Sequence, residues 1–155
     1  MNILRFMQVL ALGTWVGSIL YFSSVVTIGA FRVLTRDQAG ALVGFTLGGL
    51  HMLALIAAVV YVVAALAMER SLRAMTAPAT LAVILMFVLT LASQRIVIPR
   101  MDVLRAQMGS VDAMPATNPL RAEFDRLHGI SVQLEGGVLL IGLVALYLTA
   151  RAKPA

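Results

Sequence analysis

Cysteine is absent from the 155 residues of this chain, which excludes disulfides, thiolate metal ligands and cysteine nucleophiles. Charge is also scarce: charged residues make up 12% of the chain and hydrophobic residues 61%, whereas a soluble domain is about half apolar and a quarter charged. The chain also lacks a Ser/His/Asp arrangement, a phosphate-binding glycine loop and a nucleotide-binding fingerprint. These absences exclude a water-soluble globular protein, and they leave no residue to assign to catalysis.

Long apolar runs are what the chain has instead. Charge-free runs cover residues 6–31, 38–68 and 74–94, and a fourth run, 127–150, contains Glu135 as its one charged residue. About 20 helical residues cross a hydrocarbon core of about 30 Å. We therefore predict an all-α integral membrane protein, a single domain over residues 1–155, with spans at about 6–31, 39–68, 76–98 and 127–149. The first run is too long for the apolar part of a signal peptide, so we expect it to be a retained helix.

Local signals mark where the helices begin. Thr35 and Gln38 form a capping-box pattern, Thr76 is expected to cap the third helix, and Asn118 followed by Pro119 indicates the start of the fourth. Residues 99–126 are rich in charge and turn formers. We expect them to form an aqueous hairpin in which the third helix, kinked near Pro99, and the fourth helix protrude from the membrane.

The twelve lysines and arginines lie mainly at the ends of the apolar runs. Attraction to anionic headgroups explains them, so we expect the lipid bilayer and not nucleic acid as the partner. Four spans place both termini on one side. The number of positive charges does not decide between the two sides, and we expect cytoplasmic termini because the positive charges beside them are not diluted by acidic residues. We expect the inner membrane of a bacterium. The positive charges expected beside the termini are Arg5, Arg70, Arg73, Arg151 and Lys153.

Two histidines and one carboxylate carry the functional prediction. His128 and Glu135 are seven residues apart, which places them within about 20° of each other around one helix. His51 lies in the middle of the second apolar run. An ionisable side chain within a span costs about 2.5–3.5 kcal/mol, so each is a candidate functional residue. Two imidazoles and a carboxylate are a common ligand set for iron, copper or zinc, and we predict a metal site at His51, His128 and Glu135. Haem bound through the same histidines is an alternative.

Other polar residues near the spans could add a ligand or orient one: Asp125, Tyr21, Ser131, Gln94 and Arg95. Ordinary structural roles are the competing interpretation. His128 could accept a hydrogen bond at the membrane surface, a protonated Glu135 could bond to Gln94, and Arg95 could reach the headgroups. In that case His51 is a satisfied packing residue.

Small residues recur at helical spacing in the first two spans, which is typical of closely packed membrane helices. They are Gly13, Gly17, Gly40, Gly44 and Gly48. The pattern does not say whether the packing helix belongs to the same chain or to another, and we expect a homo-oligomer.

Three segments resemble the bacterial relatives of the transmembrane protein 205 family: Gly13-Thr-Trp-Val-Gly17, residues 30–45 from Ala30-Phe31 through Gln38-Ala-Gly40 to Gly44-Phe45, and Phe124-Asp-Arg-Leu-His128-Gly-Ile-Ser131. The resemblance implies a small four-helix membrane protein, and its eukaryotic members are associated with resistance to platinum drugs. It matches His128 and Ser131 to positions of the family, whereas Glu135 stands where many relatives would have an amide.

The leading functional hypothesis is therefore metal handling or redox chemistry at an intramembrane site. A non-catalytic membrane scaffold or lipid-binding homo-oligomer is the first alternative. A proton-coupled transporter or channel, which Glu135 could serve, is the second.

Overall fold

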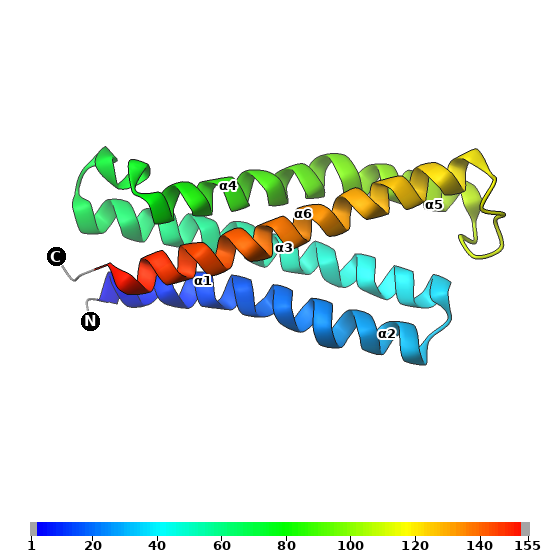
Figure 1. Cartoon of the computed structure of the whole chain (residues 1–155), viewed down its shortest axis with the longest axis horizontal. Helices are drawn as coiled ribbons and strands as arrows, with labels where there is room; N and C mark the ends of the chain where they lie inside the picture. The colour runs from blue at the N-terminus through cyan, green and yellow to red at the C-terminus, as the bar shows by residue number, and fades with distance from the viewer. Residues whose placement is uncertain (1–2, 153–155) are drawn as a thin grey trace.

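The computed structural model describes residues 3–152 and folds them into four long helical rods (Figure 1). All four are long and apolar enough to cross a membrane, so the predicted four-span membrane protein is confirmed. The described residues contain no strand. Lys153, one of the expected charges beside the termini, lies outside them. The first rod consists of α1 (Ile3–Tyr21), η1 (Phe22–Val26) and α2 (Thr27–Val33), and the second is α3 (Arg36–Glu69). The third rod consists of α4 (Pro78–Ala92), η3 (Ser93–Val97) and α5 (Ile98–Met108), and the fourth is α6 (Pro119–Arg151).

The helix-start signals hold at two of three positions. Thr35 and Gln38 form the expected capping box at α3, and the side chain of Asn118 accepts from Leu120 N at the start of α6. Thr76 as a cap is wrong: Ala77 is the N-cap of α4, without a side-chain bond, and the Thr76 hydroxyl donates to the carbonyl of Arg73. The physical reason is a short 3₁₀ turn, η2 (Leu72–Thr76), in which Thr76 still belongs to the connection.

Two π turns interrupt the first and third rods. The second, η3, ends just before Pro99, and the amide of Ile98 bonds to the carbonyl of Ser93 instead of Gln94. Proline has no amide hydrogen, so the i−4 carbonyl of Arg95 loses its usual donor, and a wider turn accommodates this. Because the π turn contains an extra residue, it also rotates the following residues by about 100° relative to an uninterrupted helix.

One half of the bundle is closed and the other is split. In the closed half α1, α3, α4 and α6 surround a core that includes Trp15, Met86 and Val138. Toward the other end the pair α2 and α3 diverges from the pair α5 and α6 (Figure 1). The second pair has a small core of its own, made by Val97, Met101, Met108, Phe124 and Leu127.

The start of α1 and the end of α6 lie together at the closed end (Figure 1). Arg5 donates from Nη2 to the carbonyl of Thr149 and, at 2.7 Å, to that of Ala152. A cation at the C-terminus of a helix interacts favourably with the negative end of the helix dipole. The hairpin formed by α5 and α6 is at the split end, and its protrusion into water remains a prediction.

Candidate functional site

A buried histidine connects three of the four rods. His51 on α3 has no exposed surface. Its Nδ1 lies 2.8 Å from Oε1 of Gln94 in η3, and its Nε2 lies 3.2 Å from Oε2 of Glu135 on α6. The Glu135 side chain is 14% exposed, and its Oε1 is buried without a hydrogen-bond partner among the described residues. The structure thus brings together His51, Gln94 and Glu135, one polar residue from each of three spans.

The hydrogen-bond chemistry of this cluster fixes a proton between His51 and Glu135. The Gln94 carbonyl oxygen only accepts, so Nδ1 of His51 carries a hydrogen and donates it. Nε2 then either donates as part of an imidazolium or accepts from a protonated carboxyl group. In both forms one proton lies between Nε2 and Oε2.

Glu135 connects this cluster to a cleft between the two diverging helix pairs, because its side chain lines the inner end of that cleft. The cleft has a volume of about 620 Å³, is lined by residues of all four rods, and reaches from Arg36 and Asp112 at the split end to Glu135, Gly136 and Leu139. One stripe of α6 lines its length. Asp125, His128, Ser131 and Glu135 follow one another at three- and four-residue intervals and all face the cleft.

His128 lies nearer the mouth of the cleft than Glu135 does. Its side chain is exposed, and its ring stacks on Phe124 with ring centroids 6.5 Å apart. Seven residues of helix separate it from Glu135 by about 10.5 Å along the axis. Within residues 3–152 no three His, Asp or Glu side chains are grouped closely enough to hold a metal ion. Of the predicted trio, His128 and Glu135 line the cleft and His51 contacts Glu135, but the three side chains do not meet at one point in this structure.

The remaining candidate residues are distributed over different surroundings. Asp125 accepts from Nε of Arg121 at 3.0 and 2.9 Å, and Ser131 is buried in the cleft wall. Arg95 is exposed. Tyr21, 62% exposed, lies away from the cleft.

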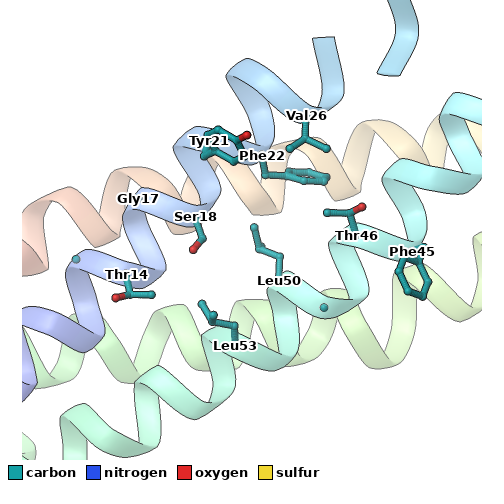
Figure 2. Close-up of a pocket in the computed structure, with 12 residues that line it drawn as sticks. Thr14, Gly17, Ser18, Tyr21, Phe22, Val26, Phe45, Thr46, Leu50 and Leu53 are labelled. Atoms are coloured by element: carbon teal, nitrogen blue, oxygen red, sulfur yellow. The ribbon is translucent and has the colours of Figure 1, made fainter. Parts of the chain in front are cut away.

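Tyr21 lines a second hollow, a shallow groove of about 770 Å³ between α1 and α3. Figure 2 shows Thr14 and Ser18 of α1 opposite Leu50 and Leu53 of α3. Gly13 and Gly17 also line this groove, and a Cβ at either would meet no described atom within 4 Å. These glycines do not pack against another helix of the same chain, and their contact with a second copy remains a prediction.

Two glycines of α3 make room for an arginine, which the sequence did not reveal. A Cβ at Gly40 would lie 3.5 Å from Nη2 of Arg105, and one at Gly44 would lie 3.4 Å from Nη1. Gly48, one turn further along, meets no described atom within 4 Å. The guanidinium of Arg105 also lies over the ring of Phe124, 5.5 Å from its centroid. The spacing of the glycines could not show whether they allow the close approach of another helix or leave space for the side chain of Arg105.

A latch joins the two helix pairs at the mouth of the cleft, also unforeseen from the sequence. Asp37 at the start of α3 accepts from the hydroxyl of Ser110 and, at 3.1 Å, from the amide of Val111. Arg36 lies 3.6 Å from the carboxylate of Asp112. The loop that follows α5 is thereby held against α3, across the split end of the bundle.

A family model described as a domain of unknown function, DUF4149, matches residues 10–110. The matched region contains His51, Gln94 and Arg105, whereas Glu135 lies beyond it. No curated protein and no solved structure matches the chain.

Proposed function

This chain belongs to the DUF4149 family, and we propose that it is a proton-conducting membrane channel whose relay site is the His51–Glu135 pair. The observation that carries the proposal is the 3.2 Å contact between Nε2 of His51 and Oε2 of Glu135, a residue that lines the inner end of the cleft. Ionisable residues inside membrane spans commonly serve proton relays, because their burial is too costly to be kept for packing alone.

The stripe on α6 supplies the route to that pair. Asp125, His128 and Ser131 line the cleft between its mouth and Glu135, and each can accept and pass on a proton. Steps of three or four residues are about 4.5–6 Å along the helix, a separation that one bridging water can span. Gln94 keeps Nδ1 of His51 engaged, so the exchangeable proton is the one on the Nε2 side.

We also propose that the termini are cytoplasmic and the membrane is the bacterial inner membrane, which makes the cleft open to the outside. The chain contains no cysteine, so a single Ala116→Cys variant, at an exposed position of the loop between α5 and α6, reports this directly. Labelling of intact cells by a membrane-impermeant maleimide is expected, and protection from the reagent would reverse the orientation.

Proton movement through Glu135 gives the direct test. In liposomes loaded with a pH-sensitive dye, the wild-type protein should dissipate a pH gradient roughly 100-fold faster than Glu135→Gln, by analogy with the contribution of a positioned proton-transfer group. Glutamine keeps the shape and a hydrogen bond to His51 but cannot carry the proton.

Asp102→Asn is the matched control, because Asp102 also lines the cleft but is exposed and lies on α5, away from the stripe. Its flux should equal that of the wild type. Equal flux in wild type and Glu135→Gln would overturn the proposal and would favour the scaffold alternative, in which the cluster only joins helices.

A bound metal ion is the second candidate, favoured by the way Gln94 holds His51. Metal-bound histidines usually donate their second ring N–H to an oxygen acceptor, as Nδ1 does to Gln94. Nε2 and the Glu135 carboxylate would then be two ligands for iron, copper or zinc, completed by water from the cleft. The resemblance to the transmembrane protein 205 family, itself still a prediction, is compatible with this.

Elemental analysis of protein purified without a metal-affinity step tests the metal candidate. About one metal ion per chain is expected, with none in His51→Ala and Glu135→Ala and full retention in Arg95→Gln. A metal content near zero in the wild type would contradict it. A visible spectrum of the same sample tests haem, which would absorb strongly.

A further inference from the structure

We propose that the cleft binds a long-chain carboxylate, a fatty acid, with its head on Arg105 and its chain along the apolar wall below. The proposal is independent of proton conduction, since it rests on a different residue and on the walls of the cleft. The volume of about 620 Å³ falls in the range of small-molecule sites, about 300–1,000 Å³.

Arg105 is the cation that the cleft leaves available. Among the described residues no carboxylate lies within ion-pair distance of it, whereas the two other arginines that line the cleft are paired: Arg36 with Asp112 and Arg121 with Asp125. Asp37 is close enough to interact electrostatically with Arg105, but its oxygens are taken by Ser110 and Val111.

The other carboxylates of the cleft do not neutralise this position. Glu135 shares a proton with His51 at the inner end, and Asp102 is exposed. An anion entering the cleft therefore finds one half-buried guanidinium without a carboxylate partner.

Among the described residues Arg105 donates no hydrogen bond. Its guanidinium carbon lies over the ring of Phe124, 5.5 Å from the centroid, and Gly40 and Gly44 leave space beside Nη2 and Nη1. A cation held over an aromatic ring still has its N–H donors available to a ligand. A planar fork of donors fits a carboxylate in a bidentate pair.

The wall beyond Arg105 suits an alkyl chain. Apolar residues from all four rods line it, among them Ile19, Phe22, Val43, Leu47, Ile98 and Leu139. An apolar cavity between spanning helices can accept an alkyl chain without exposing it to water. A charged head and an apolar wall together select an amphiphile instead of a free anion.

Equilibrium binding of radiolabelled palmitate to the full-length protein in neutral detergent tests the proposal. Wild type should bind about one palmitate per chain, and Arg105→Gln should bind it roughly 10- to 100-fold more weakly, the loss expected for hydrogen bonds to a charged group. Methyl palmitate, which lacks the charge, should bind the wild type and Arg105→Gln equally weakly.

Three controls make the result specific. Arg100→Gln removes an exposed arginine of the same helix and should leave the affinity unchanged. Gly44→Leu should displace the guanidinium and weaken binding without altering any charge, whereas Gly48→Leu should not. Inorganic phosphate should not compete.

The proposal would be overturned by unchanged palmitate affinity in Arg105→Gln, by methyl palmitate binding as tightly as palmitate, by equal losses in Arg100→Gln and Arg105→Gln, or by effective competition from phosphate. The proton flux of Glu135→Gln is a separate measurement, so failure of either proposal leaves the other standing.

Discussion

Substitution of His51 with leucine should lower the free energy of unfolding by about 2–5 kcal/mol, because it leaves two buried groups without their partner. The Gln94 carbonyl loses its donor at 2.8 Å and Glu135 loses the ring nitrogen at 3.2 Å. Each orphaned buried group costs about 1–3 kcal/mol. The apparent Tm in detergent should fall by roughly 5–15 °C.

A second substitution separates this mechanism from loss of packing. Replacing both members of a buried polar pair with apolar residues is often close to neutral, whereas breaking the pair is costly. The double variant His51→Leu/Glu135→Leu should therefore be more stable than His51→Leu alone, by about 1–3 kcal/mol, with Gln94 as the one orphan. A double variant that loses the full sum of the His51→Leu and Glu135→Leu losses would contradict the paired arrangement. Thermal unfolding of the wild type and the three variants, followed by circular dichroism, measures these losses.

The four-span fold was accessible from the sequence because membrane insertion is decided by local composition. Apolar runs longer than about 20 residues have few alternatives to a spanning helix. The capping residues Thr35 and Asn118 act through neighbouring amides, so their roles also follow from adjacent positions. α3 ends at Glu69, where Arg70 leaves the helix in a left-handed conformation that nothing in the composition required.

The candidate site was predictable only in part. His51 and Glu135 were predicted to be ligands of one metal site, and the structure places their side chains 3.2 Å apart. His128 shares the face of Glu135 but not its level, because equal angle around a helix says nothing about the rise of about 10.5 Å between them. In the competing structural interpretation Gln94 was a partner of Glu135, whereas in the structure it bonds to His51.

Arg105 had no local signal at all. It follows the π turn of η3, where the register of the third rod changes, so the face it occupies cannot be extrapolated from the residues before Pro99. Its neighbours Gly40 and Gly44 are distant in sequence, and small residues fit a side chain as well as a helix backbone. Such pairings need the tertiary arrangement.

Gly142 is the position where one added methyl group should have a large effect. A Cβ there would lie 2.7 Å from Cγ2 of Val16 and 2.9 Å from Cε of Met86, both closer than real Cβ contacts. Val16 is β-branched and stiff, and Met86, though flexible, is fully buried and has little room to move. Overpacking of this kind costs about 1–3 kcal/mol.

The higher helix propensity of alanine opposes the cost of overpacking. The sign of the change in Tm therefore shows which of the two effects is larger. Alanine exceeds glycine in helix propensity by about 1 kcal/mol, so Gly→Ala at an open helical position should stabilise. Gly137→Ala on the same helix is the matched control, because a Cβ there meets no described atom within 4 Å. We expect Gly142→Ala to lower the Tm by about 2–6 °C and Gly137→Ala to raise it or leave it unchanged.

The partner residue provides the decisive comparison. Val16→Ala removes the methyl group that Gly142→Ala would strike, so the double variant should be more stable than the sum of the two single losses by about 1 kcal/mol. Strictly additive losses, or a higher Tm for Gly142→Ala, would show that α1 and α6 approach less closely than the structure has them. Gly142 lies one turn of α6 beyond Leu139, which lines the inner end of the cleft. The comparison of these variants therefore also tests how closely the helices approach where the cleft ends.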